Sequence, residues 1–157
     1  MKIKLWSIGK VHEPYVKAGV ELFTQRISHY FPVEWKLISS SKNTSALSPN
    51  QSKKTEGESI LELLEPGDVL VVLDEKGKQL SSVQLADYIG QKANESAKNI
   101  IFLIGGAYGL DEKILNRADL QWGLSKLVFP HQLVRLILAE QIYRACTIMR
   151  NEKYHHY

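Results

Sequence analysis

Cysteine is nearly absent from this sequence of 157 residues, since Cys146 is the only one. A single cysteine excludes an intramolecular disulfide and a metal site built from several cysteines, and it is typical of proteins from a reducing compartment. We therefore expect a cytoplasmic protein that needs no metal. Long apolar runs are absent too, because the longest clusters, at Val69–Leu73 and Ile100–Ile104, have the length of a strand and not of a membrane-spanning helix.

An excess of charge of one sign is also missing, because 20 Lys and Arg residues face 17 Asp and Glu residues and leave a formal net charge of +3. This weak positive charge permits a nucleic-acid partner without demanding one. Lys2 and Lys4 interrupt the apolar start of the chain, so we expect no signal peptide. With 44% hydrophobic residues, the chain is long enough to bury one core, and we expect a single domain over residues 1–157.

What the sequence does contain is an alternation of strand-like and helix-like apolar spacing. The apolar runs Val69–Leu73 and Ile100–Ile104, joined by the amphipathic helix Ser81–Ala97, are typical of a βαβ unit in a parallel sheet covered on both faces. The whole pattern predicts an α/β fold with a mostly parallel sheet and helices on both faces. The other predicted strands are Lys2–Ile8, Glu34–Ile38, Leu120–Leu124 and the strand-like Leu127–Phe129; the other helices are Glu13–Tyr30, Lys53–Leu64, Leu110–Asn116 and His131–Met149; Ser39–Ser52 is expected to be a loop.

A glycine-rich segment, Gly105–Leu110, follows the apolar strand that ends at Ile104. In parallel α/β sheets, ligands bind beyond the carboxyl ends of the strands, and glycine lets the backbone approach a ligand closely. The spacing fits neither the dinucleotide fingerprint nor the phosphate-binding P-loop. The segment is therefore either a ligand-binding loop or a tight turn between a strand and a helix.

A second candidate segment is Leu124–His131, where a strand end leads into a helix that follows Pro130. Ser125 either contacts a ligand or caps a turn, and His131 either faces a ligand or lies exposed in the first turn of the helix. Helix amino termini offer free backbone donors and attract anions. The helix His131–Met149 is apolar over a broad surface, which predicts burial in the core or contact with a second subunit.

The carboxyl-terminal segment Arg150–Tyr157 interleaves aromatic and basic residues. That combination suits RNA, because bases stack on aromatic rings while cations contact phosphates, although disorder is the usual state of a polar terminus. Arg144 lies four residues after Glu140, so the two side chains are expected to form an ion pair on the helix. Asp74 and Glu75 follow a strand, and they either bind a ligand or open a turn that ends at Gly77.

These segments together resemble one family, the large-subunit ribosomal RNA pseudouridine methyltransferase H family of the SPOUT class. The strongest likenesses are Leu103–Leu110 to its "IGG-x-x-GL" motif, Leu124–Arg135 to its "S-x-x-x-x-PH-x-x-x-R" motif, Glu140–Ala145 to its "EQ-x-YRA" motif, and Tyr154-His155 to its terminal "YH". The segments Lys2–Lys10 and Val72–Lys78 resemble the family more weakly. The resemblance covers essentially the whole chain.

The resemblance implies a SPOUT-type fold with a carboxyl-terminal trefoil knot and a homodimer. It implies an enzyme that uses S-adenosyl-L-methionine to methylate N3 of a pseudouridine in a 23S rRNA stem-loop on the assembled ribosome. The implied cofactor-binding residues are Leu73, Gly106, Ser125, Lys126, Leu127, Val128, Phe129 and Pro130. The implied catalytic residues on the RNA side are His131, Arg144, Tyr154 and His155, with the carboxyl-terminal segment completing the site of the partner subunit.

Two alternatives remain open at this point. A nucleotide-binding oxidoreductase would explain the α/β pattern, but the glycine spacing counts against it. A non-catalytic RNA-binding module on the ribosome would explain the aromatic and basic terminus, but it would leave the glycine-rich segment without a role. One departure from the family is His156, which stands where another, more basic residue is frequent, and this puts a phosphate contact there in doubt.

Overall fold

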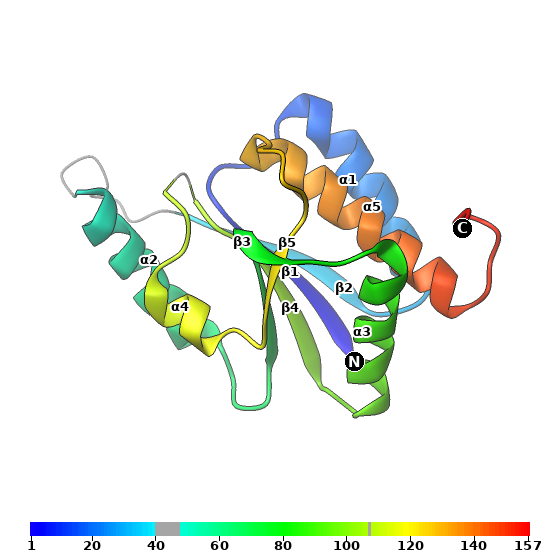
Figure 1. Ribbon diagram of the computed structural model, residues 1–157. Coiled ribbons are helices and arrows are strands. Elements are labelled where there is room, and N and C mark those ends of the chain that lie inside the picture. The colour runs from blue at the N-terminus through cyan, green and yellow to red at the C-terminus, as the bar shows by residue number, and fades with distance from the viewer. Residues whose placement is uncertain (40–47, 107) are drawn as a thin grey trace.

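The computed structural model describes residues 1–39, 48–106 and 108–157, and it forms one α/β unit (Figure 1). Strands and helices alternate along the chain, as the apolar spacing predicted. The strands are β1 Lys2–Ile8, β2 Val33–Ile38, β3 Val69–Gln79, β4 Asn99–Ile104 and β5 Leu120–Gly123; the helices are α1 Pro14–Ile27, α2 Pro49–Leu63, α3 Ser82–Asn94, α4 Glu112–Arg117 and α5 His131–Met149.

All the pairings in the sheet are parallel, and the strand order is β2-β1-β4-β3-β5. The strands β3 and β4 are neighbours, with Val69 opposite Ile100, and α3 connects them. The predicted βαβ unit is therefore confirmed. The carboxyl ends of β3, β4 and β5 meet at one edge of the sheet, which is the edge where α/β proteins bind ligands.

Both faces of the sheet are covered, as predicted (Figure 1). All six residues of β4 are buried, because alternate side chains point into two separate cores. Ile100 and Phe102 pack in the core under α1, α3 and α5, whereas Ile101 and Leu103 pack in the core under α2 and α4. The continuous apolar run in β4 is thus explained by burial on two faces. The trefoil knot implied by the resemblance stays a prediction.

The loop predicted for Ser39–Ser52 is wrong in its last part, because α2 begins at Pro49. Ser48 caps this helix: its Oγ accepts a hydrogen bond from Gln51 N at 3.3 Å, and Gln51 Oε1 accepts one from Ser48 N at 3.0 Å. This reciprocal pair is the capping box, and Pro49 suits the first helical position. Residues that suggested a loop by their polarity are therefore a helix start. The rest of the predicted loop, residues 40–47, lies outside the described residues.

Two further predictions are corrected. The strand-like segment Leu127–Phe129 is an irregular bend before α5. The strand β3 does not stop after Leu73, because its pairing with β5 resumes at Lys78 after a bulge over residues 74–77. A Cβ atom on Gly77 would lie 2.6 Å from the backbone of Gln121, so glycine is needed where the bulge crosses β5.

Candidate functional site

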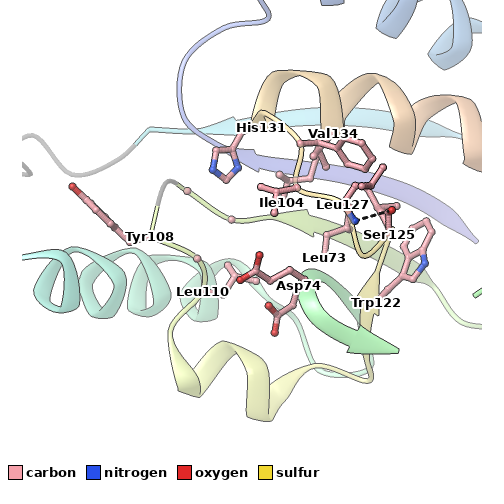
Figure 2. A pocket seen from close by; sticks show the side chains of 17 residues that line it. Leu73, Asp74, Ile104, Tyr108, Leu110, Trp122, Ser125, Leu127, His131 and Val134 are labelled. Atoms are coloured by element: carbon pink, nitrogen blue, oxygen red, sulfur yellow. Dashed lines mark hydrogen bonds between the residues drawn. The ribbon is translucent and has the colours of Figure 1, made fainter. Parts of the chain in front are cut away.

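A pocket of about 400 Å³ lies at the carboxyl ends of β3, β4 and β5 (Figure 2). Its volume falls within the range of small-molecule sites. Its walls come from four parts of the fold: the end of β3, the glycine-rich segment after β4, the bend after β5, and the first turn of α5. The lining residues are Leu73, Asp74, Glu75, Ile104, Gly105, Gly106, Tyr108, Gly109, Leu110, Trp122, Leu124, Ser125, Leu127, Val128, Phe129, His131 and Val134.

Six of the eight residues predicted to bind the cofactor line this one pocket, although they come from three separate segments. The six are Leu73, Gly106, Ser125, Leu127, Val128 and Phe129. Lys126 and Pro130 belong to the same bend but are not part of the lining. The sequence thus located the pocket, while the binding of a cofactor by these residues stays a prediction.

The bend at residues 125–129 exposes backbone groups to the pocket. Its single hydrogen bond to a described residue is the one from Leu127 N to Ser125 Oγ, at 3.0 Å (Figure 2). Backbone N–H and C=O groups in folded proteins are normally paired, so a run of unpaired groups at a pocket wall is available to a ligand. A purine ring offers matching donors and acceptors at its edge, and the apolar side chains of Leu73 and Leu127 suit its faces.

The glycine-rich segment forms a narrow turn at the opposite wall. Gly109 N donates to Gly106 O at 3.1 Å, and Gly109 has a φ of +82°, which favours glycine. A Cβ atom on Gly105 would lie 2.9 Å from the side chain of Leu110. The segment is therefore a tight turn and a pocket wall at once, so the two interpretations left open by the sequence are compatible. Ala107 lies outside the described residues.

Asp74 and Glu75 line the pocket from the bulge of β3. Figure 2 labels Asp74 at this place. Carboxylates at this place suit a ligand that carries positive charge or hydroxyl groups. With the apolar walls and the unpaired backbone of residues 125–129, they form a set of groups that fits S-adenosylmethionine, which has an adenine, a ribose and a cationic sulfonium. The sequence left Asp74 and Glu75 undecided, because the bulge that carries them depends on pairing with β5.

His131 stands at the mouth of the pocket, exposed in the first turn of α5. The other three predicted catalytic residues, Arg144, Tyr154 and His155, lie together at the far end of this helix. Thirteen residues separate His131 from Arg144, which corresponds to about 20 Å along the helix axis. Figure 1 shows the carboxyl terminus beyond the end of α5 that is distant from the glycine-rich segment. Within one chain, the structure therefore does not bring these residues to the pocket.

The distal group is ordered around Glu140. Glu140 Oε1 accepts hydrogen bonds from Arg144 Nη2 at 2.6 Å, from Arg144 Nε at 3.0 Å and from Tyr154 Oη at 3.1 Å. The guanidinium of Arg144 also lies over the Tyr154 ring, 4.7 Å from its centroid, and its Nη1 is 3.2 Å from His155 Nδ1. Because arginine has only donors, His155 Nδ1 must accept in this contact. The expected Glu140–Arg144 ion pair is confirmed, and we name these four residues the tail cluster.

Burial and the hydrogen bond to Glu140 raise the pKa of Tyr154 above its ordinary value. The phenol therefore stays protonated at neutral pH and acts as a donor. The carboxyl-terminal segment packs on α5 instead of being disordered, since Tyr154 also stacks edge-on against Tyr143 at 4.8 Å. Sequence reasoning identified Arg144, Tyr154 and His155 but assigned Glu140 only to an ion pair and missed its central place in the cluster.

Tyr108, Leu110 and Trp122 also line the pocket and were not predicted to do so. Tyr108 and Leu110 lie inside the glycine-rich segment, so its position after a strand was the available signal. Trp122 gave no signal, because its place depends on the position of β5 at the sheet edge. Within residues 1–39, 48–106 and 108–157, no helix is long and apolar enough to cross a membrane, and no group of three or more His, Cys, Asp or Glu side chains is placed to hold a metal ion.

The fold is shared with a solved structure described as "The structure of a probable methylase family protein from Haemophilus influenzae Rd KW20". The two superpose with a TM-score of 0.57 at 11% sequence identity, over 99% of this chain and 70% of that chain. At this low identity, the likeness concerns the fold alone.

Closer relatives match the chain along its length. A protein of Cytophaga hutchinsonii named "Ribosomal RNA large subunit methyltransferase H" is 47% identical, over 99% of this chain and 100% of that protein. A protein of the same name from Parabacteroides distasonis is 46% identical, over 99% of each chain. The family profile described as "Predicted SPOUT methyltransferase" matches residues 1–155. The chain therefore belongs to the SPOUT methyltransferase family, among the relatives of the large-subunit ribosomal RNA methyltransferases H.

Proposed function

We propose that this protein is an S-adenosyl-L-methionine-dependent methyltransferase that methylates N3 of a pseudouridine in 23S rRNA of the assembled large ribosomal subunit. The observation that carries the proposal is the pocket beyond β3, β4 and β5, with its apolar walls and the backbone of residues 125–129, which forms a single hydrogen bond to a described residue. The full-length likeness to proteins named ribosomal RNA large subunit methyltransferase H supports the choice of substrate. A ribosomal substrate implies a cytoplasmic enzyme.

The pocket residues would hold the cofactor by its adenine and ribose. In this arrangement Leu73 and Leu127 would cover the faces of the adenine, the backbone of residues 125–129 would pair with its edge, and Gly106 would contribute a wall without a side chain. When bound, S-adenosylmethionine supplies an electrophilic methyl group. Because this group is already reactive, the main task of the protein is to align N3 of the base and to exclude water.

The tail cluster would hold the base and manage the proton on N3. Arg144 donates to the carbonyl oxygens beside N3, where negative charge develops as the proton leaves. Tyr154 orients the base through contact with its aromatic ring, since its only hydroxyl hydrogen is donated to Glu140 Oε1. His155 relays the proton once Arg144 turns from it to the base, because Nδ1 then becomes free to accept. His131, at the mouth of the pocket, contacts the RNA from the side of the cofactor.

A homodimer would bring the two halves of this machinery together. The tail cluster lies about 20 Å along α5 from the pocket of its own chain, too far for a side chain to reach the reacting atoms. A two-fold arrangement of the chains would place the cluster of one subunit beside the pocket of the other. Leu127 and Val128 support such an interface, since they are 70% and 82% exposed at the pocket rim.

The proposal is tested by calorimetric titration with S-adenosylmethionine and by transfer of its labelled methyl group to ribosomes that lack the modification. The Ser125→Trp variant fills the pocket, so it should lose both cofactor binding and transfer. The matched control is Ser59→Trp, at an exposed position on α2 that is not part of the pocket lining, which should keep both. Cofactor binding that survives in Ser125→Trp would refute the assigned pocket. A wild-type protein that binds the cofactor and methylates no ribosomal RNA would refute the assigned substrate.

A further inference from the structure

A second pocket, of about 450 Å³, lies beside the candidate cofactor pocket and shares Gly106 and His131 with it. It is formed by the end of β1, the connection to α1 and the first turns of α5. We name it the Arg135 pocket. Its lining residues are Ile8, Gly9, Lys10, Val11, His12, Glu13, Pro14, Gly106, His131, Gln132 and Arg135. The lining thus holds two cations, Lys10 and Arg135, and two histidines, but only one carboxylate, that of Glu13. This composition favours the binding of an anion.

Arg135 is the most unusual residue of this pocket, because its side chain is 1% exposed. Its hydrogen bonds go to neutral groups: Nε donates to Ser7 Oγ at 2.9 Å, and Nη1 donates to Lys10 O at 2.8 Å. Nη1 also lies 3.3 Å from His12 Nδ1. No carboxylate among the described residues forms an ion pair with Arg135. A buried charge without an opposite partner is costly, and proteins normally pair it.

His12 does not supply the missing charge. Burial and the nearby Arg135 guanidinium lower the pKa of His12, so its ring is neutral at pH 7 and Nδ1 accepts the hydrogen bond. Burial also lowers the pKa of Arg135, as expected for a cation that lacks an anionic neighbour in direct contact. The acceptors around Arg135 therefore orient the guanidinium without neutralising it.

The remaining amino group of the guanidinium, Nη2, lies beside Gly9, which is a lining residue of the pocket. An arginine side chain has five N–H donors, and three of them are used by Ser7, Lys10 and His12. The two donors on Nη2 form no hydrogen bond with a described residue. Nη2 lies against Gly9, where a Cβ atom would come within 3.3 Å of it, and Gly9 also lines the pocket. Gly9 has no side chain to cover this nitrogen, and Arg135 as a whole is 1% exposed.

We infer that the Arg135 pocket binds a phosphate of the RNA backbone next to the base that is methylated. The inference rests on the proposed function for its choice of RNA as the source of the phosphate. A guanidinium that is already oriented and has both N–H donors of Nη2 free is well suited to bind phosphate oxygens. Lys10 is exposed at the rim and adds a second cation, and Val11, 75% exposed, marks an opening to the surface through which an RNA strand continues.

Two anions are candidate occupants of the Arg135 pocket, an RNA phosphate and the carboxylate of the cofactor, and the position of the pocket favours the phosphate. His131 and Gly106 separate it from the candidate cofactor pocket, whose own rim carries Asp74 and Glu75. A phosphate bound by Arg135 would fix the sugar-phosphate backbone on one side of His131 while the base lies on the other. The carboxylate of the cofactor's methionine part is the competing occupant, and the experiment below distinguishes the two.

The direct test follows the Nε–H resonance of Arg135 by NMR in the full-length protein. The probes are inorganic phosphate, a short uridine oligonucleotide and S-adenosylmethionine, each added alone and in combination. Phosphate and the oligonucleotide should shift this resonance both without and with saturating cofactor. Arg117, which is paired with Asp119 at 3.3 Å, is the internal control and should not move. A resonance that answers only to the cofactor would assign the pocket to the carboxylate, and one that answers to no probe would make Arg135 purely structural.

Variants provide a second and independent test. Lys10→Ala is exposed and should fold normally, raise the KM for ribosomes by about threefold to tenfold and lower the salt slope of RNA binding by about 1. Its kcat and its affinity for the cofactor should not change. Lys98→Ala is the matched control, because Lys98 is exposed and directly precedes β4, at the edge of the sheet opposite the carboxyl ends of the strands. An unchanged KM in Lys10→Ala would overturn the inference. Because phosphate binding is measured without turnover, absent methyl transfer would refute the proposed function and leave the phosphate result standing.

Discussion

Glu140 and Arg144 face each other across one turn of α5, with Glu140 Oε1 at 2.6 Å from Arg144 Nη2 and 3.0 Å from Arg144 Nε. The same oxygen accepts the hydroxyl of Tyr154 at 3.1 Å. One carboxylate thus fixes two of the side chains that we propose to contact the base. Its removal should disturb both at once and leave the cofactor pocket untouched.

Replacing Glu140 with glutamine should therefore lower kcat for methyl transfer by about tenfold to a hundredfold, the size expected when a hydrogen bond to a charged group worth about 1.5–3 kcal/mol is lost. The affinity for S-adenosylmethionine, measured by calorimetry, should stay within twofold. Glu95→Gln is a matched control, because Glu95 pairs with Lys92 at 3.3 Å away from the site. A normal kcat in Glu140→Gln would show that the carboxylate of Glu140 is not needed to position Tyr154 and Arg144.

In the proposed dimer, each site combines the pocket of one subunit with the tail cluster of the other. Two inactive variants, one changed in the pocket and one in the tail cluster, should therefore restore activity when they are mixed. Ser125→Trp blocks the pocket, and the double variant Tyr154→Ala/His155→Ala removes the tail cluster; each homodimer should be inactive, although the double variant should keep cofactor binding. After mixing and subunit exchange, half of the dimers are mixed and each holds one intact site, so activity should return to about one quarter of the wild-type value. Labelled methyl transfer to ribosomes measures this.

Mixing Ser125→Trp with Glu140→Gln/Tyr154→Ala should give the same recovery, whereas mixing two pocket variants should give none. A mixture of a pocket variant and a tail-cluster variant holds the intact pocket and the intact tail cluster on different chains. If this mixture stays inactive, the site is built within one chain. In that case the carboxyl-terminal segment must move a long way to reach its own pocket.

Cys146 should lower the free energy of unfolding as the pH rises, and its effect should begin at a lower pH than the effect of the tyrosines. Burial raises the pKa of its thiol to about 12 from an ordinary value of 9.0. Above pH 9 the unfolded chain loses this proton while the folded chain keeps it, so the free energy of unfolding should drop by roughly 1 kcal/mol between pH 9 and pH 10. Urea unfolding at pH 8, 9 and 10 measures the drop.

The control is Cys146→Ala, whose drop in the free energy of unfolding between pH 9 and pH 10 should be smaller than that of the wild type by roughly 1 kcal/mol, whatever its effect on absolute stability. The pKa values of Tyr30 and Tyr88 are raised to about 12, and their unfolded forms ionise near pH 10, so they begin to contribute between pH 9 and pH 10 and dominate the slope above pH 10. Equal slopes in the two proteins between pH 8 and pH 9.5 would mean that the thiol is accessible to water.

Two glycine substitutions should act in opposite directions. Gly77→Ala places a Cβ atom 2.6 Å from the backbone of Gln121, so it should destabilise the protein by about 1–3 kcal/mol and weaken cofactor binding through the displaced bulge. Gly90→Ala lies in the middle of α3 and meets only Met149 Sδ at 3.5 Å, so it should stabilise the protein by about 0.5–1 kcal/mol. Thermal unfolding distinguishes these outcomes, and a neutral Gly77→Ala would show that the bulge relaxes freely.

The parts of the fold that depend on local pattern were predictable. The burial of β4 on both faces produces a continuous apolar run, and the bounds His131–Met149 of α5 follow from Pro130 and a long apolar repeat. The pocket was also predictable in outline, because parallel strands share one carboxyl edge and candidate segments followed three of them. The order of strands in the sheet was not, since it is decided by packing between distant segments.

The missed features share one physical cause, which is dependence on partners far away in the sequence. The bulge that carries Asp74 exists because β3 pairs twice with Trp122 of β5. Arg135 gave little signal, because its role depends on Ser7, which is 128 residues away. The start of α2 is different: Ser48 and Gln51 were a local signal that the polar composition around them obscured.

The length of α5 has a consequence for how this protein can vary. The first turn of the helix lines the pocket and its last turns carry the tail cluster, so the helix fixes the distance and the orientation between them. One inserted residue would shift the cluster by about 1.5 Å and rotate it by about 100° around the axis. In the proposed dimer, the pocket of the partner subunit would then face the wrong side chains. Insertions and deletions among functional homologues should therefore spare α5 and fall in the surface connections, where no such spacing is kept.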